Sequence, residues 1–264
     1  MAKIISIFNH KYVLLLIICS ISVEAVASAN NNIKIDKNRP ADFVDVKQFI
    51  PEIQTDIRYY SKHNFVGRKI NGYAQPLCLL TKPAAIALKT AESQLLTMGL
   101  TLKAYDCYRP QTAVNDFAQW ATQTHNIAMQ TEFYPRVNKK NLFSDGYIAY
   151  QSGHSRGSTL DLTIVPQNSV IPPYNPQLKQ VNCTAAWQNR FPDNSLDFGT
   201  GFDCFSPVSH PAYQQLSPQI KANRLLLQTI MKQAGFKALD TEWWHFTLIN
   251  EPYPNTYFDF PVKD

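Results

Sequence analysis

The sequence predicts a single α+β domain in which helices pack on a mainly antiparallel sheet. Two observations carry this prediction: long segments with a helical apolar period are interspersed with short segments of alternating strand period, and no repeat, low-complexity tract or linker divides the chain. A length of 264 residues suits one or two domains, and the absence of a linker favours one.

The N-terminus has the features of a secretory signal peptide. Lys3 and Lys11 form a basic region, residues 12–23 are apolar, and Ala27-Ser28-Ala29 is a small-residue cleavage signal. We expect cleavage after Ala29, which leaves residues 30–264 as the mature domain in the periplasm or outside the cell. The apolar run is too short to span a membrane, so we expect no stable membrane anchor; a retained anchor is the alternative.

The first half of the mature chain predicts two helices with a strand between them. Residues 43–60 mix short apolar groups with Pro51 and suggest extended segments near the surface. A helix begins at Thr81, a capping residue followed by Pro83, and ends at Gly99. Alternation over residues 100–108 then predicts a strand, and a second helix runs from Pro110 to about residue 125.

The second half predicts two strands separated by a long connection and a helix. Residues 158–165 alternate between apolar and polar side chains, which is the period of a strand. Residues 166–191 are irregular and rich in proline, and such segments usually have functional or disulfide support. A helix starts at Ser217-Pro218 and stops at Gly235, and residues 241–249, rich in Trp, Phe, Thr and Ile, predict the last strand.

Two short runs contain residues suited to metal chemistry. The run from Ser152 to Asp161 reads Ser-Gly-His-Ser-Arg-Gly-Ser-Thr-Leu-Asp and includes His154, and the run Glu242-Trp-Trp-His245 lies downstream. Two histidines and one aspartate are a suitable ligand set for a catalytic zinc with one position open for water. Glu242 would then be free to act as a general base on that water.

The spacing of Glu242 and His245 is a difficulty for this interpretation. Residues three apart on a regular strand point to opposite faces of the sheet. A twist or bulge in the strand is therefore needed if both side chains are to reach one metal site.

Each candidate also has a purely structural interpretation. His154 could be a surface or hydrogen-bonded histidine, and His245 could be a satisfied core histidine. Asp161 could form a salt bridge with Arg156, Arg109 could pair with Asp106 at the surface, and Glu242 could pair with a surface lysine. Tyr59 could be an ordinary half-buried aromatic. The occurrence of two histidines and two carboxylates in two short runs favours the metal site.

The cysteines and the charge balance limit the class of protein. Four cysteines follow the expected cleavage site, and an even number in an exported protein suggests disulfides. Of the three pairings open to them we favour Cys183 with Cys204 and Cys78 with Cys107. The formal net charge of +5 is mild, and no Lys/Arg cluster with interleaved aromatics is present, so nucleic-acid binding is not indicated.

The motifs resemble those of the zinc peptidases of family M15, in particular the D-alanyl-D-alanine dipeptidases of the VanX type. The resemblance rests on Ser152–Asp161 and Glu242–His245, and it extends to the runs Asp106-Cys-Tyr-Arg-Pro110, Asp56–Phe65 and Phe198–Asp203. It covers residues from about 43 to 251. The chain departs from the pattern at Gly153, where a serine is common, and in its extra cysteines.

The resemblance implies the α+β, hedgehog-like fold of the D-Ala-D-Ala peptidases. It implies one zinc on His154, Asp161 and His245, with Glu242 as base and Arg109 steadying the oxyanion. Ser152 and Tyr59 would contact a small D,D-dipeptide substrate, and hydrolysis would serve cell-wall peptide metabolism. Two rival functions are a zinc D,D-carboxypeptidase acting on longer stem peptides and a non-catalytic envelope-binding domain. The oligomeric state is not indicated.

Overall fold

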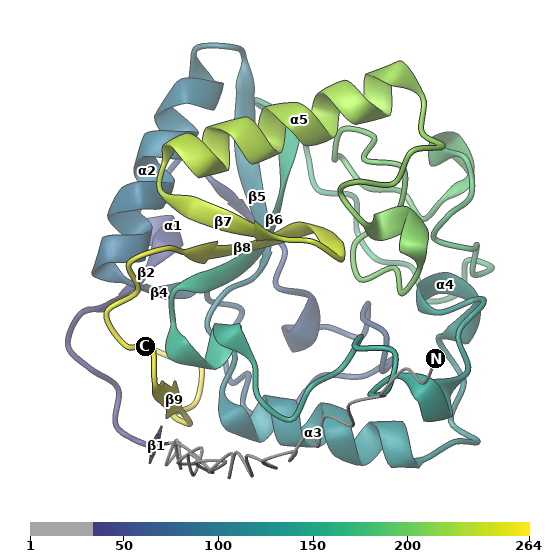
Figure 1. Ribbon diagram of the computed structural model, residues 1–264, viewed down its shortest axis with the longest axis horizontal. Coiled ribbons are helices and arrows are strands. Elements are labelled where there is room, and N and C mark those ends of the chain that lie inside the picture. The colour runs from purple at the N-terminus through teal and green to yellow at the C-terminus, as the bar shows by residue number, and fades with distance from the viewer. Residues whose placement is uncertain (1–33) are drawn as a thin grey trace, which may run out of the picture. The chain divides into compact units, whose positions relative to one another are not determined.

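A five-stranded sheet with the order β3-β5-β6-β8-β7 supports the fold (Figure 1). The structure is a computed structural model that describes residues 34–264, so the expected signal peptide, residues 1–29, lies outside the described residues. β3 runs parallel to β5, and the other three pairings are antiparallel, as predicted. The strands are β3 (Gln54–Thr55), β5 (Leu100–Asp106), β6 (Thr159–Pro166), β7 (Phe236–Leu239) and β8 (Glu242–Leu248).

Two small sheets and several short helices complete the framework. β1 (Lys34–Asp36) pairs in parallel with β9 (Thr256–Phe258), and β2 (Phe43–Asp45) pairs antiparallel with β4 (Leu79–Thr81). The short helices are α1 (Val46–Phe49), α4 (Gln130–Phe133), and the 3₁₀ turns η1 (Arg58–Tyr60), η2 (Lys139–Asn141), η3 (Gly153–Arg156), η4 (Trp187–Asn189) and η5 (Pro207–Ser209).

Three long helices pack around the five-stranded sheet. They are α2 (Lys82–Leu96), α3 (Gln111–Thr122) and α5 (Pro218–Gln233). α2 contacts β5 and α5 contacts β7, and the two helices touch each other. In Figure 1 these two helices lie on one side of the strands and α3 lies on the other. All three were predicted to within a few residues, because capping residues and prolines mark their starts and glycines mark the ends of α2 and α5.

Two regions differ from the sequence prediction. β7 was not predicted: it begins directly after Gly235, which has φ +93°, and forms a hairpin with β8. The prediction that residues 43–60 lie near the surface was wrong, because their apolar side chains belong to the core. Their elements are too short to show a period, and only pairing with β4 and β5 reveals which side chains are covered.

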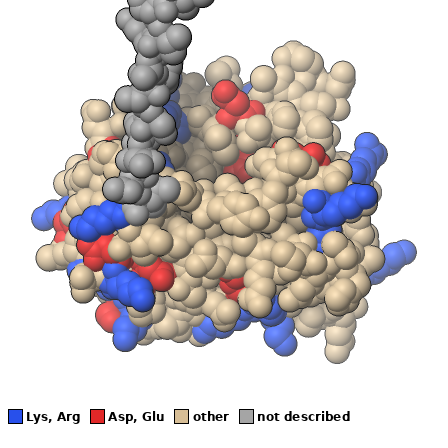
Figure 2. All heavy atoms as spheres, turned by 60° about the horizontal axis from the view of Figure 1, so that its bottom comes forward, with Lys and Arg blue, Asp and Glu red and all other residues tan. Residues whose placement is uncertain are grey.

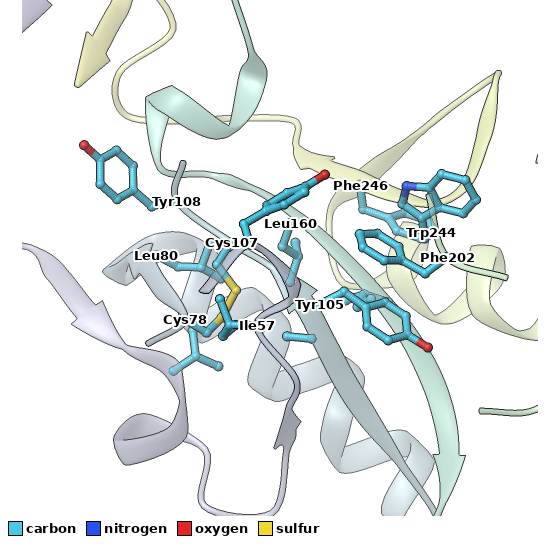
Figure 3. Close-up of a cluster of buried hydrophobic side chains, with 14 of the residues drawn as sticks. Ile57, Cys78, Leu80, Tyr105, Cys107, Tyr108, Leu160, Phe202, Trp244 and Phe246 are labelled. Atoms are coloured by element: carbon cyan, nitrogen blue, oxygen red, sulfur yellow. A yellow bond between two sulfur atoms is a disulfide. The ribbon is translucent and has the colours of Figure 1, made fainter. Parts of the chain in front are cut away.

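Both cysteine pairings that we favoured are present as disulfides. Cys78 is bonded to Cys107, and Cys183 is bonded to Cys204. Figure 3 shows the first bond among buried side chains that include Ile57, Leu80 and Leu160. The second bond ties the long segment that follows β6 to the end of the Phe198–Asp203 run, which supplies the support expected for so long an irregular segment.

The described surface is consistent with the mild charge of the sequence. On the face shown in Figure 2, Lys and Arg side chains are distributed around the margin among acidic side chains rather than gathered into one patch. Across residues 34–264, every helix is too short or too polar to cross a membrane.

The turn that follows η3 depends on a glycine. Gly157 has φ +79°, and a Cβ added there would lie 2.2 Å from Cζ of Phe43. Gly99 has a similar φ of +72°, with nothing within 4 Å of the added Cβ. The left-handed conformation is therefore shared by both glycines, whereas the lack of space is specific to Gly157.

We predict that Gly157→Ala destabilises the protein more than Gly99→Ala does. Gly99→Ala should lower the free energy of unfolding by about 1–2 kcal/mol through backbone strain alone. Gly157→Ala should lower it by about 3 kcal/mol or more, because overpacking against Phe43 adds to the strain. Urea unfolding of the two variants measures the difference. Equal losses would contradict the role assigned to the Phe43 contact.

Candidate metal centre and active site

The register of three neighbouring strands brings two aspartates and a histidine side by side. Asp161 on β6 is directly opposite Asp106 on β5 and directly opposite His245 on β8. His154 reaches the same place from η3, the turn that precedes β6. Ser152 caps this turn by accepting a hydrogen bond from the backbone N–H of His154, and Gly157 ends it. Residues from three strands and one turn therefore converge at one end of the sheet.

The side-chain atoms of His154, Asp161 and His245 form a nearly equilateral triangle. His154 Nε2 lies 3.3 Å from His245 Nδ1, and Asp161 Oδ1 lies 3.4 Å from the former and 3.1 Å from the latter. A tetrahedral zinc with bonds of about 2.0–2.1 Å separates its ligand atoms by about 3.3 Å. The triangle thus has the dimensions of one face of such a site.

The hydrogen bonding of the triangle also suits a cation. Within residues 34–264, Asp161 Oδ1 is buried and has no hydrogen-bond partner of good geometry, an arrangement that is unfavourable for a carboxylate oxygen. His154 Nδ1 donates to the carbonyl oxygen of Cys107 at 2.8 Å, so the lone pair of Nε2 faces the triangle. The three residues therefore fit a bound metal ion.

The protonation states of His154 and Asp161 favour metal binding. Burial lowers the pKa of His154, which keeps its imidazole neutral, as a ligand must be. Burial alone would raise the pKa of Asp161, but the neighbouring imidazoles of His154 and His245 outweigh it and hold that pKa well below its usual range. Asp161 is thus an anion. Burial alone would lower the pKa of His245, but the hydrogen bond and charge of Asp161, together with the charge of Glu242, raise it, so His245 must give up its proton when a metal binds.

An irregularity in β8 brings Glu242 to the same side as His245. Ala238 of β7 pairs with Phe246, yet the next residue, Leu239, pairs with Glu242, so three residues of β8 bulge out of register. Glu242 Oε2 consequently lies 3.4 Å from His245 Nδ1. This is the bulge that the spacing required. Burial raises the pKa of Glu242 to about 7, a value suited to exchanging protons near neutral pH.

Arg109 extends from the end of β5 across the site. Its Nε donates to Asp106 Oδ2 at 2.9 Å, while its terminal nitrogens make only long contacts, 3.4 Å to Ser152 Oγ and 3.5 Å to Asp161 Oδ2. The guanidinium stacks over the ring of Tyr59 at 4.9 Å. The pairing of Arg109 with Asp106 therefore exists, but it is buried, and it leaves the terminal N–H groups free to bind another acceptor.

These groups line one cavity of about 290 Å³. Its wall includes the candidate metal ligands, the candidate base, the arginine and the serine, which are His154, Asp161, His245, Glu242, Arg109 and Ser152. Tyr59 and Asp203 also line it. The Tyr59 hydroxyl donates to Asp203 Oδ2 at 2.8 Å. The cavity has the volume of a small-molecule site rather than of a groove for a long polymer.

Comparison with known proteins agrees with the geometry. The model of the Peptidase M15 family, described as D-Ala-D-Ala dipeptidase, matches residues 39–171 and 192–263. The chain is 34% identical over 223 residues to the D-alanyl-D-alanine dipeptidase of Enterococcus faecium, a stretch covering 84% of this chain and 98% of the relative. The chain belongs to the M15 peptidases.

Further relatives agree with this placement. The D-alanyl-D-alanine dipeptidase of Streptomyces coelicolor is 34% identical over 84% of this chain and 98% of its own. That of Escherichia coli is 30% identical over 78% of this chain and 84% of its own. The M15 family consists of metallopeptidases, so the chain is a hydrolase of that class, and its helices packed on a mainly antiparallel sheet are the fold that the resemblance implied.

The structure also tests several of the purely structural interpretations of the candidate residues. Arg156 pairs with Glu251 at 2.7 Å, so the proposed salt bridge to Asp161 was wrong. The closest ion-pair contact of Glu242 is His245 rather than a surface lysine. Tyr59 is almost completely buried in the cavity wall rather than half-buried. The roles of His154, Asp161, His245, Glu242, Arg109, Ser152 and Tyr59 remain predictions that this arrangement supports.

Asp203 was not singled out from the sequence, although it ends the Phe198–Asp203 run that resembles the M15 family. It is buried, and its φ of +55° is unusual for a residue other than glycine. Burial and the nearby charge of Asp161 raise its pKa well above the ordinary value. Backbone strain and an acid facing a cavity are features of functional sites, but neither can be read from the sequence.

Asp106 is the buried support of the site. The Asp106 carboxylate accepts one hydrogen bond from Arg109 and another from the Tyr73 hydroxyl, the latter at 2.6 Å. The side chain is completely buried. Asp116 provides a comparison, since it is also buried but pairs with Arg68, whose side chain is 45% exposed.

We predict that Asp106→Asn lowers the free energy of unfolding by about 3 kcal/mol or more, because it leaves the buried guanidinium of Arg109 without its counter-ion. Asp116→Asn should lower it by about 1 kcal/mol, because water can solvate Arg68. Chemical denaturation of both variants at neutral pH provides the comparison. A loss at Asp106 no larger than that at Asp116 would show that Asp106 is not the main counter-ion of Arg109.

Proposed function

We propose that this chain is a zinc-dependent dipeptidase that hydrolyses D-alanyl-D-alanine to D-alanine in the cell envelope, as part of cell-wall peptide metabolism. The observation that carries the proposal is the triangle of ligand atoms beside Glu242 on the wall of a small cavity. The relatives named above, all D-alanyl-D-alanine dipeptidases, support the choice of substrate.

In this proposal, one zinc ion is held by His154 Nε2, Asp161 Oδ1 and His245 Nδ1. Two neutral nitrogen ligands and one carboxylate are a common donor set for catalytic zinc. Once bound, zinc would lower the pKa of a water molecule and polarise the scissile carbonyl. The carbonyl oxygen of Cys107 keeps His154 in the tautomer that can bind.

Glu242 is the proposed general base. Its carboxylate lies next to the metal-binding atom of His245 without being part of the triangle, so it can accept a proton from the attacking water. A pKa of about 7 lets it give that proton to the leaving amine in the same turnover. Arg109, whose terminal N–H groups have only long contacts, is positioned to stabilise the oxyanion that forms on the carbonyl oxygen.

The cavity suits a substrate with a free amino terminus. Asp203 and Tyr59 form a hydrogen-bonded pair on its wall, and an ammonium group there would pair with the Asp203 carboxylate and favour its ionised form. A dipeptide has such an ammonium next to its scissile bond, whereas a longer stem peptide has an amide at that position. Ser152, between Arg109 and the His154 turn, is a further contact for the dipeptide. These contacts favour a dipeptidase over a carboxypeptidase.

We also propose that the mature protein, residues 30–264, acts outside the cytoplasm, in the periplasm or as a secreted protein. Two disulfides within the described residues support this placement, because such bonds persist in oxidising compartments. The signal-peptide pattern of residues 1–29 supports it independently.

The metal assignment predicts about one zinc per chain in the purified protein. His154→Ala should lose that zinc, because only two ligands remain and their geometry is no longer fixed. His125→Ala is a control, since His125 lies in the turn that follows α3 and outside the cavity wall. Metal analysis after dialysis decides the assignment: full zinc occupancy in His154→Ala would rule it out.

The catalytic assignment predicts that Glu242→Gln keeps zinc but loses turnover of D-alanyl-D-alanine by about 10²–10⁴-fold, the usual contribution of a general base. Glu92→Gln, a change at a buried glutamate on α2 that does not line the cavity, should alter turnover by less than a few-fold. Measuring kcat and zinc content together on both variants separates the base from a metal ligand.

The same assay tests the substrate class. The wild-type chain should hydrolyse the dipeptide and leave a pentapeptide ending in D-alanyl-D-alanine almost untouched. Comparable kcat/KM for the two substrates would instead identify a D,D-carboxypeptidase. Near-normal turnover in zinc-loaded Glu242→Gln would mean that another residue is the base.

A further inference from the structure

The disulfide between Cys78 and Cys107 lies directly behind the metal centre. The carbonyl oxygen of Cys107 accepts the hydrogen bond from Nδ1 of His154, at 2.8 Å. Cys107 is the first residue after β5, and it lies between Asp106, which supports Arg109, and Arg109 itself. Both half-cystines are almost completely buried, and Figure 3 shows their bond within the core.

The segment that carries this carbonyl is not held by the central sheet. β5 ends at Asp106 and α3 begins at Gln111, so Cys107 and Tyr108 belong to neither element. They are held from the side of β4: the Tyr108 N–H donates to the Leu79 oxygen at 2.9 Å, and the disulfide fixes Cys107 to Cys78, the residue before β4.

β4 also holds the other side of the His154 turn. The Thr81 N–H donates to the oxygen of Gly157 at 2.8 Å, and the Thr81 hydroxyl is hydrogen-bonded to that of Ser158 at 2.7 Å. β4 thus contacts both the turn that carries the histidine and the carbonyl that orients it. Within this frame, the disulfide is the covalent cross-link and the other contacts are hydrogen bonds.

We propose that the Cys78–Cys107 disulfide is a positioning element for the metal centre, which strengthens zinc binding by fixing the carbonyl that orients His154. The proposal rests on the zinc site proposed above. Partners of a metal-binding histidine typically change metal affinity by about 10–100-fold when they are lost. Without the cross-link the Cys107 carbonyl is still present, but its segment is then held to β4 only by the hydrogen bond from the Tyr108 N–H to the Leu79 oxygen.

The second disulfide supplies a matched control. The backbone carbonyls of its two cysteines accept hydrogen bonds from groups other than His154. The Cys183 oxygen accepts from the Gly201 N–H at 3.0 Å, and the Cys204 oxygen accepts from the Ser209 hydroxyl at 2.6 Å. Removing this bond deletes a cross-link of similar length, with a sequence separation of 21 rather than 29, without touching the partner of His154. Cys204 directly follows Asp203, which lines the cavity, so loss of this bond could affect turnover. The control is therefore compared with the other chains in zinc affinity and not in activity.

The test compares the zinc dissociation constants of the wild-type chain, C78A/C107A and C183A/C204A. Competition with a chromophoric chelator measures them at a temperature where circular dichroism shows all three chains to be folded. Alanine at position 107 keeps the backbone carbonyl, so only the cross-link is removed. We expect the dissociation constant to rise about 10-fold or more in C78A/C107A and to stay within about twofold in C183A/C204A.

Each outcome has a definite meaning. Equal affinity in C78A/C107A and wild type, with only a lower melting temperature, would overturn the proposal and leave the bond a purely stabilising one. Equal weakening by both double variants would overturn it as well, since the effect would not depend on the His154 partner. A wild-type chain that binds no zinc would instead refute the proposed function.

A second preparation covers the case in which C78A/C107A does not fold. The C183A/C204A form of the mature chain, residues 30–264, produced in an oxidising and in a reducing host, differs between the two only in the Cys78–Cys107 bond, as mass spectrometry of the peptides can verify. The dithiol form should bind zinc about 10-fold more weakly than the disulfide form. If this dithiol form also fails to fold, the Cys78–Cys107 bond serves overall stability, and the proposal is overturned.

Discussion

The buried carboxylate of Asp161 is the constraint on which the arrangement of the site depends. It lies on the central strand of the sheet, directly across from a second buried carboxylate, that of Asp106. Two such anions on neighbouring strands repel each other and are poorly solvated, so each requires its own positive partner. Asp106 has the guanidinium of Arg109 and the hydroxyl of Tyr73, and Asp161 has the imidazoles of His154 and His245.

This division gives Arg109 two tasks that reinforce each other. Its Nε neutralises Asp106, which fixes the direction of the guanidinium, and its terminal nitrogens are thereby directed into the cavity. An arginine held on one edge by a buried carboxylate loses little conformational freedom when its other edge binds an anion. The same ion pair thus supports the fold and orients the group proposed to stabilise the oxyanion.

Two departures from regular pairing bring the functional side chains together. The extra residue of β5, Tyr105, lies where the register shifts between Ala104 and Asp106, and its ring stacks on Phe202 at a centroid distance of 4.4 Å. The three-residue bulge of β8 turns Glu242 toward His245. In a regular pleat Glu242 and His245 would point to opposite faces of the sheet, so the proposed chemistry depends on these irregularities.

The sequence by itself determined the long elements and the residues of the candidate metal site. α2, α3, α5, β5, β6 and β8 follow from caps, prolines, glycines and apolar period, which are properties of neighbouring residues. Only the tertiary structure decided the β7 hairpin, the burial of residues 43–60, the bulge at Glu242 and the place of Asp203 on the cavity wall. Each of these depends on pairing or packing with a distant part of the chain or, at Asp203, on a strained backbone, and periodicity within a segment contains no information about its partner.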